Sequence, residues 1–114
     1  MINIIEKKIV DFLKKNTDVY VATEYPDRDV EQFYCVNKTG GSGKFLKKAT
    51  IVLQSCSNVS MADAALLHDS GKKIMEGLIE DPDISCLELT NDYEYSNEKT
   101  KYRRYQAVFE IGYY

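Results

Sequence analysis

Residues 32–56, QFYCVNKTGGSGKFLKKATIVLQSC, decide the fold of this chain. The two ends of the stretch, residues 32–37 and 49–56, are rich in β-branched and aromatic side chains, which is typical of strands. Glycines at positions 40, 41 and 43 lie between them and predict a flexible hairpin tip. Because strands joined by a hairpin run antiparallel, this stretch favours an antiparallel sheet over a βαβ arrangement.

The residues before this hairpin predict one helix and one short strand. Residues 2–15 form an amphipathic pattern at helical spacing, with charged side chains on the opposite face. Residues 19–23 (VYVAT) predict a strand, and the charged residues 24–31, which include Pro26, predict a loop. The apolar positions of the helix are Ile2, Ile5, Ile9, Phe12 and Leu13.

A second helix is predicted after the hairpin. Ser60 is followed three positions later by Asp63, which is a variant of the capping box that begins many helices. Pro82 marks the end of the helical pattern. The predicted buried stripe of this helix contains Ala64, Leu67, Gly71, Ile74, Met75 and Leu78.

Two more strands are predicted at residues 84–95 and 102–114, separated by a polar turn. The element order is then α-β-β-β-α-β-β. This order predicts an α+β fold, with a mainly antiparallel sheet flanked by two helices, in a single domain over residues 1–114. The side chains expected on one face are Leu87, Leu89, Tyr93 and Tyr95 in the first strand and Tyr105, Ala107, Phe109, Ile111 and Tyr113 in the second.

Composition excludes several classes of protein. The chain has 114 residues, 15 Lys and Arg against 18 Asp and Glu, and a net charge of -3, which argues against binding nucleic acid through phosphate contacts. Its 44% hydrophobic content predicts a folded chain. With no long apolar run and no signal-peptide pattern at its start, we expect neither membrane association nor export.

The sequence shows no convincing reactive site. Cys35, Cys56 and Cys86 form no CxxC pair and are expected to be free thiols, and His68 has no neighbouring metal ligand. The glycine-rich residues 39–44 lack the spacing of a phosphate-binding loop. We therefore expect no catalytic residue, metal or cofactor, although a cysteine nucleophile with His68 as its base stays open as an alternative.

Charge is unevenly distributed along the chain. Residues 1–59 contain nine basic and seven acidic residues, whereas residues 60–114 contain six basic and eleven acidic ones. Residues 38–48 carry four lysines and no acid, and residues 76–98 carry eight acids and no base. Two complementary patches on one subunit predict head-to-tail self-association, which generates rings or filaments.

Residues 25–41, YPDRDVEQFYCVNKTGG, resemble a passage of the tail terminator (tail completion) proteins of long-tailed bacteriophages. In that passage a proline and a basic residue precede a phenylalanine-bearing strand and a Thr-Gly-Gly turn. Three further matches follow in the same order: ATIVLQSCS at 49–57, NVSMADAALLHDSGKKIM at 58–75 and RRYQAVFEI at 103–111. The resemblance extends over roughly residues 5–112.

The resemblance implies a structural protein of the virion and not an enzyme. Such a protein forms a ring, typically a homohexamer, on the last ring of tail tube protein, stops tail polymerisation and offers its other face to a head-completion or neck protein. The implied location is the head-proximal end of the tail, after assembly in the host cytoplasm. DNA can pass through the ring, without recognition of its sequence and without a membrane partner.

We expect two segments to carry the contacts between subunits and with partners. One is the lysine-bearing hairpin, whose glycines would let it bend, and the other is the entry to the last strand. The expected residues are Lys38, Gly40, Gly41, Gly43, Lys44, Lys47 and Lys48, and Tyr102, Arg103, Arg104 and Tyr105. Three alternatives remain open: another head-tail joining (neck or stopper) protein, a small cytosolic enzyme, or a protein-binding adaptor.

Overall fold

The computed structural model describes residues 4–26, 30–42, 47–94 and 102–113. The predicted α+β class and the order α-β-β-β-α-β-β are confirmed. A short 3-10 helix, η1, extends the second helix. The elements are α1 (Ile4–Asn16), β1 (Tyr20–Ala22), β2 (Gln32–Ser42), β3 (Lys47–Ser57), α2 (Met61–Glu76), η1 (Gly77–Glu80), β4 (Ile84–Glu94) and β5 (Arg103–Tyr113).

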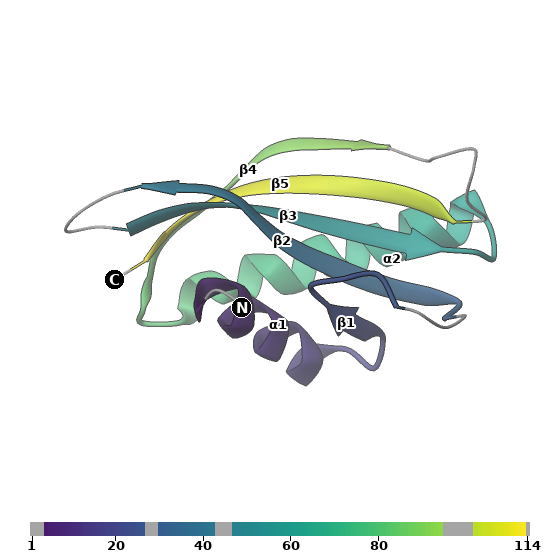
Figure 1. Cartoon of the computed structure of the whole chain (residues 1–114), viewed down its shortest axis with the longest axis horizontal. Coiled ribbons are helices and arrows are strands. Elements are labelled where there is room, and N and C mark those ends of the chain that lie inside the picture. Colours follow the sequence, from purple (N-terminus) through teal and green to yellow (C-terminus); the bar gives the residue numbers. More distant parts are fainter. Residues whose placement is uncertain (1–3, 27–29, 43–46, 95–101, 114) are drawn as a thin grey trace.

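The strands form one sheet in the order β1-β2-β3-β5-β4 (Figure 1). Only β1 and β2 are parallel, and the other neighbours are antiparallel, as predicted. β5 lies between β3 and β4, although it follows both in the sequence. β3 and β5 are paired along their whole length, from Lys47 opposite Tyr113 to Ser57 opposite Arg103.

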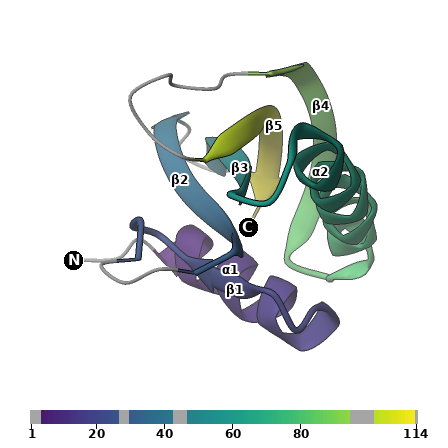
Figure 2. The ribbon, with the colours of Figure 1, turned by 90° about the vertical axis from the view of Figure 1, so that its right-hand side faces the viewer.

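Both helices cover the same face of the sheet, which we call the helix face; the other is the open face (Figures 1 and 2). Alternate side chains of the strands point into the core between sheet and helices, as the period of a strand requires. The predicted inner face of β5 is confirmed, since its three central members are buried. The core includes Ile5, Ile9 and Leu13 of α1, Leu67 and Met75 of α2, Tyr34 and Val36 of β2, Ala49, Ile51 and Leu53 of β3, and Ala107, Phe109 and Ile111 of β5.

The hairpin between β2 and β3 is longer than the sequence predicts. β2 continues to Ser42, so Gly40 and Gly41 belong to the strand and not to a tip. Gly40 does not use a left-handed backbone, and a Cβ there would lie 3.7 Å from the hydroxyl oxygen of Thr50, an ordinary contact. Hydrogen bonds from β3 stabilise the strand despite its glycines. Gly43 and Lys44 lie outside the described residues.

A bulge in β4 makes the predicted single face of that strand wrong. Leu89 is opposite Phe109, but the next pair joins Asn91 to Val108, so Thr90 is an extra residue. Because one inserted residue reverses the alternation, Leu87 and Leu89 lie on the helix face, whereas Tyr93 lies opposite Gln106 on the open face. Tyr95 lies outside the described residues.

Helix α2 begins as predicted and is fixed against β2. Ser60 is its N-cap, and its hydroxyl oxygen accepts a hydrogen bond from the backbone N–H of Asp63 at 3.1 Å. Further along, the buried hydroxyl of Tyr34 donates to the carbonyl of Leu67 at 2.6 Å. The ring of Tyr34 passes Gly71 so closely that a Cβ on Gly71 would lie 2.6 Å from ring atom Cε1.

We predict that Gly71→Ala lowers the free energy of unfolding by up to about 2 kcal/mol, because the pinned Tyr34 ring cannot move away from the new methyl group and the close contact costs about 1–3 kcal/mol. This cost outweighs the gain of about 1 kcal/mol that alanine brings to a helix interior. Urea denaturation would measure it.

Gly77→Ala is the matched control for this prediction. Gly77 has a φ of -68°, and its added Cβ would lie 3.5 Å from Phe12, an ordinary contact. We expect no loss of stability, or a gain of about 0.5 kcal/mol. Equal unfolding free energies for the two variants would contradict the packing described for Tyr34.

Candidate functional site

The structure places the predicted contact residues in two groups at opposite ends of the sheet. Lys47 and Lys48 are opposite Tyr113 and Gly112, whereas Arg103 and Arg104 are opposite Ser57 and Cys56. Ten steps of about 3.3 Å along β3 separate the two ends, or about 30 Å. The fold therefore does not join the two predicted segments into one surface of a subunit.

The first group is the basic arm, which we define as Lys38, Lys47 and Lys48. Lys47 and Lys48 are exposed and Lys38 is half-buried. None of the three forms an ion pair with another described residue, whereas Lys7, Lys8, Lys72 and Lys73 all do. The charge of the basic arm is thus directed at solvent or at a partner.

The second group makes contacts mainly within the chain. Tyr102 donates to the carbonyl of Val30 at 2.6 Å, and its ring meets Phe33 edge to face at 5.1 Å between centroids. Arg104 donates to the hydroxyl of Tyr25 and lies over that ring. The ring of Tyr105 stacks on His68. Arg103 is the exposed member of this group.

A polar network around a buried serine and a buried histidine links three elements on the helix face. Ser55 of β3 lies 2.9 Å from Nδ1 of His68, on α2, and Nε2 of His68 lies 2.7 Å from Asp92 of β4. The second carboxylate oxygen of Asp92 accepts from Lys72 at 2.5 Å. The bulge at Thr90 makes this possible, because it places Asp92 opposite Ala107 on the helix face.

The charges in this network are set by burial. Burial lowers the pKa of His68 and outweighs the opposite effect of Asp92, so the ring is neutral at pH 7. Burial alone would raise the pKa of Asp92. The hydrogen bonds from Lys72 and His68 lower that pKa by more than burial raises it. Asp92 is therefore a carboxylate, Nε2–H of His68 donates to it, and the hydroxyl of Ser55 donates to the bare Nδ1.

This order of groups resembles a nucleophile, a base and an acid, but Ser55 has no exposed surface. The network consequently acts as a tie between β3, α2 and β4. No local sequence pattern predicts this network, because Ser55 and His68 are 13 residues apart and His68 and Asp92 are 24 residues apart. Sequence reasoning missed it for that reason.

The cysteine and histidine of the enzyme alternative are not brought together among the described residues. Cys35 and Cys56 pack with Phe33 on the open face, whereas His68 lies on the helix face. Burial raises the pKa of Cys35 and raises that of Cys56 to about 12, so both are neutral thiols. Cys86 is exposed, at the opposite end of β4 from Asp92.

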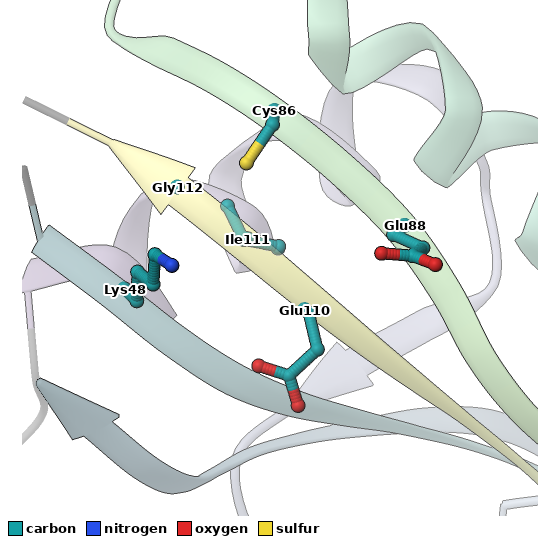
Figure 3. Close-up of a pocket in the computed structure, with 6 residues that line it drawn as sticks. All are labelled: Lys48, Cys86, Glu88, Glu110, Ile111 and Gly112. Carbon is teal, nitrogen blue, oxygen red and sulfur yellow. The ribbon is translucent and has the colours of Figure 1, made fainter.

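The open face has a shallow pocket of about 260 Å³ beside β4 (Figure 3). Gly112 lies in the middle of it, between Lys48 and Cys86 of the two neighbouring strands. Glu88 and Glu110 are directly opposite each other, a like-charge pair that costs stability. The hydroxyl of Thr50 donates to Glu110 at 2.8 Å. The pocket thus presents a surplus of negative charge next to the edge of the sheet.

Over the part of the chain that the structure describes, no group of three or more histidine, cysteine or acidic side chains is arranged to hold a metal ion. Within the same residues, no helix has the length and apolar character needed to cross a membrane. The features that stand out among the described residues are the basic arm, the acidic strand β4 and the polar tie that joins β3, α2 and β4.

The His68 network generates a prediction about pH. Because burial lowers the pKa of folded His68 below its ordinary 6.5, the unfolded chain takes up the proton first as the pH falls. Stability should therefore be complete above about pH 6.5 and decline as the pH falls below it. Urea denaturation of the wild type at about pH 7.5 and about pH 5.5 would show the loss.

The control for this measurement is His68→Gln, which keeps an amide in the network but does not titrate. Its unfolding free energy should change less than that of the wild type between the two pH values. Both values are above the range in which Asp92 takes up a proton. If the two proteins lose the same amount, the neutral state assigned to His68 is incorrect.

The fold has a relative among solved structures, although no protein-family model and no curated protein matches the sequence. That relative is a chain in the "Virion of native gene transfer agent (GTA) particle". The TM-score is 0.57 at 13% sequence identity, and the match covers 92% of this chain and 83% of that chain. At this identity, the likeness shows a shared fold.

Proposed function

We propose that this chain is a structural subunit of a phage-like virion, which forms a ring on the head-proximal end of the tail tube. The ring, a homohexamer in our proposal, stops tube polymerisation and then offers its free face to a head-completion or neck protein. The subunit carries no catalytic activity in this role. Its partners are a second copy of itself, the tail tube protein and the neck protein.

The observation that carries this proposal is the fold match to a chain of a gene transfer agent virion. The match spans 92% of this chain, so it involves both helices and the sheet and not a single hairpin. The stretches that resemble tail terminator proteins extend over the same elements. The likeness in fold favours a structural component of a phage-like virion, and the likeness in sequence pattern is the ground for choosing the tail terminator among such components.

The distribution of charge supports a ring built head to tail. Lys38 of the basic arm lies on β2, near one edge of the sheet, and β4 with its acidic residues forms the opposite edge (Figure 2), while Lys48 lines the same pocket as Glu88. Two different, complementary surfaces on one subunit give a heterologous contact, which closes into a ring when the rotation between subunits allows it. Acidic residues that remain exposed toward the channel would repel the phosphates of DNA and let it slide through.

Termination in this proposal is a mismatch of interfaces. One face of the ring has the contacts that the last ring of tube protein accepts, and the other face lacks those that another tube subunit requires. The tube stops growing because the surface exposed at its end is no longer that of the tube protein. The same new surface is then specific for the neck protein, so termination and head attachment follow from one binding event.

We predict that phage whose genome lacks the gene for this chain produce overlong tails without heads, because nothing ends the tube. Electron microscopy of lysates would measure tail length and head attachment. Supplying the wild-type chain from a plasmid should restore normal tails, which is the control for effects on neighbouring genes.

The same images separate the proposal from its rivals. Tails of normal length without heads would assign the chain to another head-tail joining step and not to termination. Complete particles with normal tails would contradict any role in tail completion.

A further inference from the structure

One edge of the sheet is an unpaired strand. β4 is the outermost strand, with 11 residues, and its hydrogen-bonding partner is β5 alone among the described strands. Every residue from Glu88 to Glu94 is exposed. N–H and C=O groups that face away from the neighbouring strand at such an edge are a template for another strand, although the N–H of Asp92 donates to the side chain of Asn91 at 2.9 Å.

The opposite edge is also partly open. β1 is only three residues long and covers β2 at Phe33, Tyr34 and Cys35. Within the described chain, residues 36–38 and 40–42 of β2 therefore pair only with β3, and Thr39 is a bulged residue between them. The stretch includes Lys38 of the basic arm, and the other two members of the arm begin the neighbouring strand.

We propose that residues 36–42 of one copy of this chain add to β4 of the next copy and continue the sheet from subunit to subunit. This inference rests on the proposed ring and names the contact that builds it. The occupant of the β4 edge is thus a second copy of this chain and not a foreign peptide.

The directions of the strands agree with this contact. β2 is antiparallel to β3, β3 to β5, and β5 to β4, so β4 runs antiparallel to β2 within one subunit. A second copy placed beside β4 in the same orientation brings its β2 antiparallel to that strand. Antiparallel pairing is the more stable kind, and the helices of both copies stay on the same face of the joined sheet.

Charge selects this pairing over others on both faces. On the helix face, Lys38 lies opposite Ile51, and Glu94 is the exposed β4 acid on that face that faces a second copy, because Asp92 is already paired with Lys72. On the open face, Lys48 of the incoming copy and Glu88 of the first copy lie on the same side of the joined sheet.

The acids of β4 exclude the most obvious competing contact. Two β4 edges pairing with each other would bring together two strands that both carry acids, among them Glu88 and Glu94, and like charges across strands are destabilising. A symmetric dimer through β4 is therefore disfavoured. The basic edge of β2 is the complementary partner, and its contact is heterologous, as a ring requires.

Hydrogen exchange of the wild-type chain tests the contact without any substitution. The assembled ring and the monomer, separated by concentration and salt, would be compared by mass spectrometry. We expect slower exchange in the assembly at residues 36–42 and 84–94, and little change on the exposed side of α2. Assembly without added protection in either edge would overturn the proposed contact.

A charge exchange tests specificity. One double variant, Lys38→Glu with Lys48→Glu, reverses the charge of the basic arm. The other, Glu88→Lys with Glu94→Lys, reverses the charge of the β4 edge. Each double variant alone should self-associate at least about tenfold more weakly at low salt, because like charges then meet. An equimolar mixture should assemble again, since each arm finds an edge of opposite charge on the other variant.

The matched controls reverse charges elsewhere: Lys15→Glu with Lys73→Glu, and Glu76→Lys with Glu80→Lys. These exposed residues lie on the helices, so their variants should assemble like the wild type. Sedimentation would measure all the states, with circular dichroism as the check of folding. If the wild type forms rings and both test variants form the same rings equally well, the edge contact is overturned but the ring is not. A wild type that is monomeric under all conditions overturns the ring and the proposed function with it.

Discussion

Burial of alternate side chains of β3 beneath two helices is the constraint on which the rest of this structure depends. β3 is paired over all its length with β5 on one side and with β2 on the other, and Ala49, Ile51 and Leu53 point into the core. Because side chains alternate, the same register leaves Thr50, Val52 and Gln54 on the open face. The central strand thereby assigns one side of the protein to the main core, while the other side carries the smaller buried cluster around Phe33 and the exposed part of the sheet.

The polar tie between Ser55, His68 and Asp92 is a second consequence of this register. Ser55 follows the buried apolar residues of β3 on the same face, so its hydroxyl meets His68 under the sheet. Asp92 reaches that histidine only because the bulge reverses the alternation of β4. Groups that serve catalysis in other proteins here hold the exposed edge strand to a helix, at the position where we propose that another subunit is bound.

The sequence was informative where the deciding contacts are local. The Ser60 cap, the alternation of residues 103–113 and the order of the elements are all carried by neighbouring residues, and the structure agrees with them. The notch at Gly71 for the ring of Tyr34 depends on residues 37 positions apart and leaves no local pattern. The glycines of the hairpin were misleading because hydrogen bonds from β3 outweigh their low strand propensity.

The position of β5 inside the sheet determines the sequence of events during synthesis. β4 is made before β5 but, among the described strands, pairs only with β5, so it cannot join the sheet until β5 has emerged from the ribosome. The pairing of β3 with β5 also spans α2 and β4, and contacts across such long loops form slowly. A nascent chain therefore has no acidic edge to offer to a finished neighbour. Folding itself would delay assembly until each subunit is complete.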